Sequence, residues 1–218
     1  MNSIRNVALA AALAVAFAAC STHPVGAGNE AVVIRTFSFP WSASPAPRTE
    51  FRAAIVGDRW HFTFDAEDHD IVVAPRWRGE STVDAEDRVE IFLARDAALE
   101  HYFCIEIDPL GRVHDYAASH YRKFDSTWNC PGLMTSARRT ANGYQVEGNV
   151  PLASLEVMLG QPVHSGDTVL AGLFRAEFYG HEERTQGAAD DNWISWVKPE
   201  PKKPDFHVPS AFAELRLR

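Results

Sequence analysis

Residues 101–116 read H-Y-F-C-I-E-I-D-P-L-G-R-V-H-D-Y, and this stretch predicts a β-hairpin. Between Tyr102 and Asp108 the side chains alternate, with F, I and I on one face of a strand and C, E and D on the other. Pro109 and Gly111 then favour a turn, because Pro presets φ and Gly accepts a positive φ without strain. The chain therefore reverses into a second strand from Arg112 to Tyr116, and the first strand carries the Glu106 carboxylate on the face opposite its apolar residues.

Short runs rich in β-branched and aromatic residues lie on both sides of this hairpin and predict further strands. Turn-like segments separate the runs, among them V-G-D-R at residues 56–59 and the tight-turn signal Asn142-Gly143. The pattern predicts an all-β fold, a β-sandwich of two mostly antiparallel sheets. The other expected strands span residues 32–39, 51–56, 60–64, 71–73, 88–93, 133–139, 141–150, 169–179 and 212–217.

One segment predicts a short helix. From Pro151 to Leu159, leucines recur three and four residues apart, with Pro at the start and Gly160 just past the end. We expect this helix to act as a short lid between strands rather than to join a helix bundle.

The N-terminus resembles a secretory signal. Arg5 precedes an apolar run from Val7 to Ala19, which ends in F-A-A-C at Cys20. This layout is similar to a bacterial lipoprotein signal, in which Cys20 becomes the acylated first residue, and ordinary export with cleavage nearby is the alternative. We expect residues 1–19 to be the signal peptide, residues 20–29 a tether, and residues 30–218 the folded domain. The protein would then lie in the bacterial periplasm or at the outer membrane, with membrane contact only through its lipid anchor.

Length and composition limit the classes of protein that this chain can represent. A chain of 218 residues with 46% hydrophobic composition can bury one sizeable core, so we expect one folded domain. The formal charge is −8, and it becomes −9 without residues 1–19, which hold one Arg and no acid. An acidic chain that lacks a basic cluster repels nucleic acid. Besides Cys20 the chain has Cys104 and Cys130, for which a disulfide and two free buried thiols are both open.

Charged residues stand in the middle of several apolar strands. They are Glu90 in R-V-E-I-F-L, Glu106 in C-I-E-I-D, Glu147 in Y-Q-V-E-G-N-V, and Arg175 and Glu177 in G-L-F-R-A-E-F-Y. A charge in such a position is tolerated where its face meets water, a partner charge or a ligand. We therefore predict one polar sheet surface that combines these residues, with Arg175 offsetting the acids. A face that is merely solvated is the alternative for each of them.

Aromatic side chains beside carboxylates suit a sugar, because an aromatic ring stacks on the apolar face of a sugar ring while carboxylates bind its hydroxyl groups. Trp77 lies between two arginines in a predicted loop and is the best candidate for an exposed stacking residue. We interpret Trp196, within I-S-W, as a core residue. Trp128 and Trp193 also lie in or near predicted loops.

Two acidic segments are of a type that calcium accepts, D-A-E-D-H-D at residues 65–70 and A-D-D-N at residues 189–192. Neither has the Gly-centred spacing of an EF-hand loop, so solvated turns are the favoured interpretation and structural calcium is the alternative. The nine histidines form no close ligand pattern such as H-E-x-x-H, which argues against zinc.

Four motifs in order resemble family 9 carbohydrate-binding modules and their relatives, and their order and spacing match over residues 30–218. The motifs are D-R-V-E-I-F-L at residues 87–93, H-Y-F-C-I-E-I-D-P-L-G-R-V-H-D at residues 101–115, G-Y-Q-V-E-G-N-V-P-L-A-S-L at residues 143–155, and I-S-W-V-K-P followed by F-H-V-P-S-A-F-A-E-L-R-L within residues 194–217. The resemblance implies a β-sandwich of the kind attached to xylanases and also found alone in exported bacterial proteins. Xylan and carbohydrate catabolism are its implied context.

In the sugar-binding members of that family the ligand lies between two tryptophans, one just before the D-x-V-E strand and one shortly before the terminal P-S-x-F. This chain has Asp84 at the first position and Phe206 at the second. The family's acidic residue is kept as Glu90, whereas Glu106 replaces an Arg of the hairpin strand. The resemblance therefore implies a modified sugar site, in which Phe206 stacks on the ligand and Trp77 substitutes for the missing tryptophan.

The leading hypothesis is a non-catalytic carbohydrate-binding domain with a groove lined by Glu90, Glu106, Arg175, Glu177, Phe206 and Trp77. We assign no catalytic residue, no metal ligand and no firm cofactor. An envelope domain that docks a protein partner is one alternative. A concave site would favour a small ligand over such a partner. A glycoside hydrolase that uses paired glutamates is a further alternative, ranked below binding because the resembling family binds without catalysis.

Overall fold

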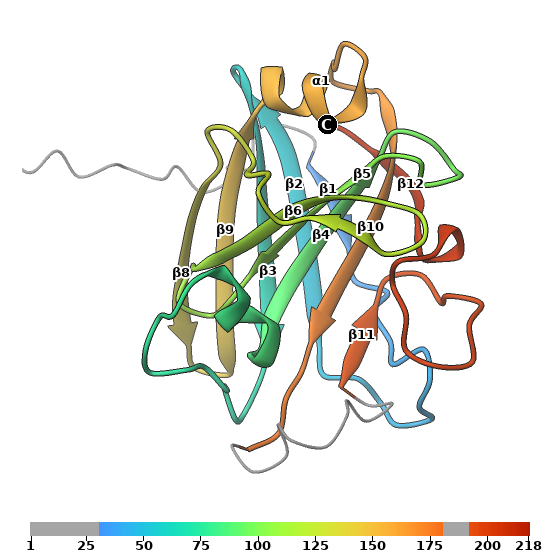
Figure 1. Cartoon of the computed structure of the whole chain (residues 1–218). Coiled ribbons are helices and arrows are strands. Elements are labelled where there is room, and N and C mark those ends of the chain that lie inside the picture. Colours follow the sequence, from blue (N-terminus) through green and yellow to red (C-terminus); the bar gives the residue numbers. More distant parts are fainter. Residues whose placement is uncertain (1–30, 181–191) are drawn as a thin grey trace, which may run out of the picture.

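Two antiparallel β-sheets face each other and form the predicted β-sandwich (Figure 1). The computed structural model describes residues 31–180 and 192–218, and all strand bounds refer to these residues. One sheet has five strands, in the order β1 (Val32–Ile34), β2 (Thr49–Val56), β3 (Arg59–Glu67), β9 (Gly143–Pro151) and β8 (Met134–Thr140). The other has seven, with β11 (Trp193–Ser195), β10 (Thr168–Ala176), β4 (Arg88–Ala94), β5 (Tyr102–Ile107), β6 (Val113–Ser119) and β7 (Lys123–Asp125) in a row and β12 (Ala213–Arg216) beside β10.

The hairpin predicted at residues 101–116 is confirmed as β5 and β6, with Glu106 opposite His114. Asp108 shapes the turn, because its carboxylate accepts hydrogen bonds from the backbone N–H groups of Leu110 at 2.9 Å and Arg112 at 2.8 Å. Gly111 has a φ of 79°, which lies in the left-handed region that glycine adopts without strain.

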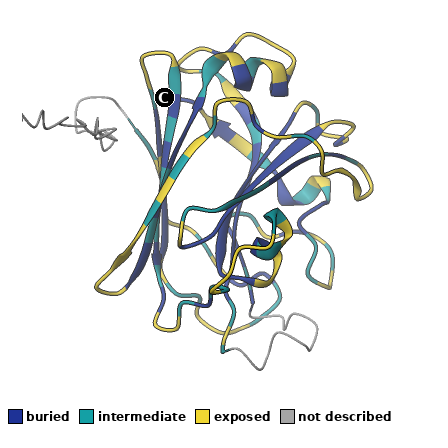
Figure 2. Cartoon of the chain, turned by 60° about the vertical axis from the view of Figure 1, so that its left-hand side comes forward, coloured by how far each residue is buried: buried dark blue, intermediate teal, exposed yellow. Residues whose placement is uncertain are grey.

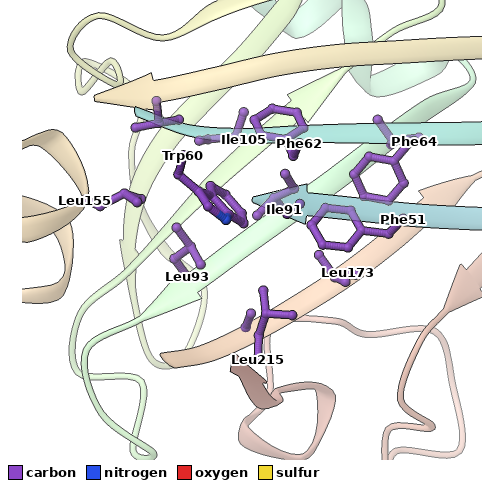
Figure 3. Close-up of a cluster of buried hydrophobic side chains, with 14 of the residues drawn as sticks. Phe51, Trp60, Phe62, Phe64, Ile91, Leu93, Ile105, Leu155, Leu173 and Leu215 are labelled. Carbon is purple, nitrogen blue, oxygen red and sulfur yellow. The ribbon is translucent and has the colours of Figure 1, made fainter. Parts of the chain in front are cut away.

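The main core lies between the two sheets, where the alternation of the strands directs their apolar side chains. Figure 3 shows Ile91, Leu93 and Ile105 of the seven-stranded sheet beside aromatic residues of the five-stranded sheet. Trp60 and Phe62 are 0% and 1% exposed. In Figure 2 the strands are mostly buried, whereas exposed residues concentrate in the loops.

A second core covers part of the opposite face of the seven-stranded sheet. Its strand residues are Phe92, Ala94, Tyr102, Cys104, Tyr116, Ala118 and Phe174. Residues 196–212, which we call the strap, contribute Phe206, Ala211 and Phe212 to the same cluster. The Trp41 indole N–H anchors the strap by donating a hydrogen bond to the Pro201 carbonyl at 2.6 Å. Both faces of this sheet are therefore partly buried.

The predicted helix is confirmed as α1 (Leu152–Leu159), and Gly160 ends it with a φ of 70°. Leu155 and Leu159 are buried in the main core at the end of the sandwich. The Arg95 guanidinium donates to the carbonyl oxygens of Val157 and Met158, which the helix itself leaves without a partner at its C-terminal end.

Several predicted segments differ from the structure. Residues 71–73 are not a strand, although Val72 hydrogen-bonds through its backbone N–H and C=O to Asp87. Two strands of three residues each, β7 and β11, were not predicted. The predicted signal peptide and tether, including Cys20, lie outside the described residues.

Cys104 and Cys130 are both free and buried, so the disulfide alternative is wrong. Cys104 belongs to the second core and Cys130 to the main core, and the seven-stranded sheet separates these two clusters. In residues 31–180 and 192–218 no helix has the length and apolar character needed to cross a membrane.

Candidate functional site

A cluster of three charged residues lies on the strap side of the seven-stranded sheet. Arg88 and Glu90 are alternate residues of β4, so they share a face, and Glu90 pairs with Glu106 across the β4–β5 register. The Arg88 Nε atom lies 2.9 Å from Glu90 Oε1 and 2.8 Å from Glu106 Oε2. Tyr116 donates its hydroxyl to Glu106 Oε1 at 2.8 Å. We call Arg88, Glu90 and Glu106 the groove cluster.

A groove with two lobes opens over this cluster. The larger lobe has a volume of about 560 Å³ and the smaller about 260 Å³. Both lobes are lined by Arg88, Glu106, Arg122 and His207, so they adjoin. The larger lobe is also lined by Glu90, Trp193, Lys203, Pro204, Asp205 and Phe206, and the smaller by Asp84, His114, Tyr116, Phe124 and Ser126.

Burial and neighbouring charges shift the pKa values of several groups in the groove. Burial, reinforced by the Glu106 carboxylate, raises the pKa of Glu90 to about 8, although Arg88 acts in the opposite direction. Burial lowers the pKa of His207 to about 4. The hydrogen bond to Asp84 raises the pKa of His114. At neutral pH, His207 is therefore neutral.

Three buried polar atoms in the larger lobe lack a hydrogen-bond partner within the described residues. They are the Glu90 Oε1 atom, the Arg88 Nε atom and the Trp193 indole nitrogen. Arg88 is close to the other two side chains, since its guanidinium also lies 5.4 Å from the Trp193 ring centroid, but it is not aligned for a hydrogen bond with Glu90 Oε1. Buried polar groups are normally satisfied, so these atoms have hydrogen-bonding capacity that the described residues do not use.

The two aromatic residues predicted to stack on the sugar, Phe206 and Trp77, lie in different parts of the structure. Phe206 lines the larger lobe, but it is only 6% exposed and its ring stacks on Phe174 at 4.0 Å between centroids. Trp77 is 46% exposed, lies 5.5 Å from the Arg112 guanidinium, and lines neither lobe. Only Phe206 of the two is therefore in the groove, and most of its ring is covered.

The predicted polar surface that combined all the strand charges is wrong for Arg175 and Glu177. Phe174 pairs with Glu90 and shares its face, so Arg175, which pairs with Val89, points between the two sheets. Its side chain is 0% exposed. Glu147 is also elsewhere, because its strand neighbour Val146 lies in the main core and Glu147 points away from it. Only Glu90 and Glu106 of the predicted charged residues meet in the groove.

Arg175 instead belongs to a second group of charges, the interior cluster, with Asp68, Asp87 and Glu177. It contacts Glu177 and lies 3.7 Å from Asp68 Oδ2. It also donates to the Glu67 carbonyl at 2.8 Å and to the Thr49 hydroxyl at 3.3 Å. One cation faces three buried carboxylates in this cluster.

The three carboxylates of the interior cluster suit a calcium ion. One oxygen from each of Asp68, Asp87 and Glu177 lies within 4.8 Å of the other two, and calcium prefers oxygen ligands. Burial raises the pKa of Asp87 to about 8 and that of Glu177 to about 7, because one Arg does not offset three buried acids. Asp68 lies in the predicted acidic segment at residues 65–70, whereas most of the other predicted segment lies outside the described residues.

Sequence reasoning missed most of the residues that line the groove, among them Arg88, His207 and Phe124. Arg88 alternates with Glu90 in R-V-E, which is a usable signal that the two side chains share a face. His207 and Phe124 stand in loop-like or polar sequence with no periodicity, so the sequence offers no comparable signal.

Comparisons with known proteins find the same fold. The family model described as "Carbohydrate family 9 binding domain-like" matches residues 29–218. No curated protein is significantly similar in sequence. A crystal structure of a candidate carbohydrate-binding protein from Bacteroides uniformis ATCC 8492 has a TM-score of 0.62 at 15% identity, covering 88% of this chain and 87% of that one.

A family 9 carbohydrate-binding module from Caldicellulosiruptor kristjanssonii is also similar, at 16% identity in both of its structures. Its complex with glucose has a TM-score of 0.55 and covers 87% of this chain and 84% of that one. Its complex with cellotriose has a TM-score of 0.53 and covers 87% of this chain and 83% of that one.

Proposed function

This chain belongs to the carbohydrate family 9 binding domain-like family, and on that premise we propose that it binds a carbohydrate in its two-lobed groove without catalysis. The concave shape of the groove favours a small ligand over a flat protein interface. Glucose and cellotriose, which the Caldicellulosiruptor module binds, are the first sugars to test.

Two of the unpartnered atoms of the larger lobe carry this proposal. The Trp193 indole N–H can only donate a hydrogen bond, while Glu90 Oε1 is a carboxyl oxygen without a partner. A sugar hydroxyl group both donates and accepts, so one polyhydroxylated ligand can satisfy both atoms. Their desolvation is already complete in the free protein, so each new bond adds to the affinity.

Arg88 takes over a role that the hairpin strand does not supply here. The resemblance to sugar-binding members implies an Arg at the position of Glu106, and Arg88 on the neighbouring strand brings a guanidinium group to the same face. The groove thus retains a cation between two acids, although its origin in the chain differs.

Binding is favoured over glycoside hydrolysis by the positions of the two glutamates. Glu90 and Glu106 both contact the same nitrogen of Arg88, at 2.9 and 2.8 Å. In a hydrolase the acid and base flank a scissile bond. Here the guanidinium group occupies the space between them, so the pair is arranged to orient a ligand.

The proposal includes export, with Cys20 as the lipidated residue and residues 20–29 as a tether. The apolar run that ends in F-A-A-C supports it. Metabolic labelling with a radioactive fatty acid should label the natural chain and not the Cys20→Ser variant. Equal labelling of the two chains would contradict lipidation at Cys20.

Isothermal titration calorimetry against a glycan panel tests the binding proposal. The panel contains glucose, cellotriose and xylotriose. Glu90→Leu and Trp193→Phe should each weaken binding about tenfold, because each removes one buried hydrogen bond to the ligand. Glu147→Gln, on the outer face of the other sheet, is the matched control and should bind as the natural chain does. Absence of binding to every glycan would contradict the proposal.

A further inference from the structure

Phe206, the ring predicted to stack on the sugar, offers little stacking surface in this chain, because it is 6% exposed and stacked on Phe174. A sugar ring that binds in the proposed groove therefore needs another aromatic surface. Of the described residues that line either lobe, Phe124 is the only aromatic one that is exposed, at 46%.

Phe124 lies in β7, which ends the row of strands in the seven-stranded sheet, and it lines the smaller lobe. Two largely buried rings hold it edge-to-face: Tyr116 at 5.3 Å and His207 at 5.0 Å between centroids. The Arg122 guanidinium lies 5.6 Å from the Phe124 centroid, and Asp205 Oδ1 accepts a hydrogen bond from Arg122 at 3.0 Å. The ring is therefore held in place while the residue as a whole remains exposed.

Polar groups beside Phe124 suit the rim of a sugar ring. Asp84 accepts or shares a hydrogen bond with His114 Nδ1 at 2.6 Å through one carboxylate oxygen, which leaves the other oxygen open to a ligand. The side chain of Asp84 is 52% exposed. Ser126 adds a hydroxyl group to the same lobe. A ring with one apolar face and hydroxyl groups at its edge fits this combination.

We propose that the smaller lobe is a second sugar subsite, in which one sugar ring stacks on Phe124 and its hydroxyl groups bond Asp84. The inference rests on the proposed carbohydrate-binding function and extends it from a sugar to an oligosaccharide of at least two rings. The adjoining ring occupies the larger lobe, where Glu90 Oε1 and the Trp193 indole nitrogen have no hydrogen-bond partner in the protein. A linked pair of rings can span both lobes, because the lobes share four lining residues.

Calorimetry with glucose and cellotriose tests the second subsite. The natural chain should bind cellotriose about tenfold more tightly than glucose, because stacking on Phe124 adds to the contacts of the larger lobe. Phe124→Ala should remove most of this difference and leave the affinity for glucose within about twofold. Phe124→Tyr keeps an aromatic face and should retain the preference for cellotriose.

Controls separate stacking from general damage to the fold. Trp77→Ala removes another exposed aromatic ring that lies over an arginine, and it should leave both affinities unchanged. Thermal unfolding should show that Phe124→Ala is as stable as Trp77→Ala. Equal affinities for glucose and cellotriose in the natural chain, or an unchanged preference in Phe124→Ala, would overturn the subsite and leave the proposed function standing. A natural chain that binds no glycan of the panel would instead count against the proposed function itself.

Discussion

The groove cluster and the interior cluster use the same residue types on opposite faces of one sheet. Each combines an arginine with carboxylates, which lie on neighbouring strands in the groove cluster and just beyond strand ends in the interior cluster. The two clusters adjoin, since Val89 pairs with Arg175 and Glu90 with Phe174. The groove cluster opens into a cavity of about 560 Å³, whereas Arg175 is enclosed by the main body of the sandwich with 0% exposure. What covers a charge, rather than which residues form the cluster, therefore decides whether it can meet a ligand.

The largest expected changes in stability and in sugar binding follow from removing the arginine of each cluster. Arg175→Met should destabilise the fold by about 3–5 kcal/mol, because it leaves three buried carboxylates without a cation. Arg88→Met should cost less, since ligand-accessible space adjoins its two acids, and it should instead abolish sugar binding. Urea unfolding followed by fluorescence measures both losses of stability. A larger loss in Arg88→Met would reverse the roles that we assign to the two clusters.

The interior cluster should also make stability depend on pH. The folded-state pKa values of Asp87 and Glu177 are raised to about 8 and about 7, so between pH 5 and pH 7 the folded chain holds protons that the unfolded chain has released. Stability should therefore be greatest at the acidic end of this range and fall as the pH rises, by up to about 1.4 kcal/mol per pH unit for each proton. Urea midpoints measured along this range check the slope.

Asp87→Asn is the matched variant for this experiment, because an amide of similar shape cannot ionise. Its stability should fall less steeply with pH than that of the natural chain. Glu147→Gln changes an acid on the outer face of the other sheet and should keep the natural slope. If Asp87→Asn had the same slope as the natural chain, the Asp87 carboxyl group of the natural chain would titrate as it does in the unfolded chain.

A smaller effect is expected from calcium. At pH 8, millimolar calcium should raise the melting temperature by about 4 °C, because the ion offsets the carboxylates of the interior cluster. The gain should vanish in Asp87→Asn, while the affinity of the groove for sugar should not change with calcium. Differential scanning calorimetry with calcium and with EDTA measures the shift. An equal gain in Asp87→Asn would place the calcium elsewhere.

The two faces of the sheet should also keep the cysteines apart. Oxidation with diamide should form no bond between Cys104 and Cys130, because they belong to separate cores. The melting temperature should therefore be unchanged by the treatment. Mass spectrometry of peptides would reveal a linked pair if the two thiols can meet.

Most of the fold followed from sequence patterns that act over several residues. Strand alternation predicted the hairpin and the inward face of β5, and Pro151 with Gly160 predicted the limits of α1. The strands β7 and β11 could not be predicted in this way, because three residues such as K-F-D or W-I-S are too short to show a period.

The site was predicted only in part because alternation defines two faces without saying which one is covered by what. In β10, both Phe174 and Arg175 are buried, one in the second core and one between the sheets. The sequence pattern favoured Phe174 for the main core, since a phenylalanine normally faces it. The strap reverses this expectation, because it buries the outer face of the sheet with its own aromatic residues.

One edge of β10 is covered by two short strands that come late in the chain. β4 pairs with one side of β10, while its other side pairs with β12 at Thr168–Ala171 and with β11 at Phe174–Ala176. Both short strands come from residues after 192, so a growing chain carries an open β10 edge until these residues have left the ribosome. Unpaired edges recruit strands from other chains. Because β11 also supplies Trp193 to the larger lobe, the step that closes this edge also completes the groove.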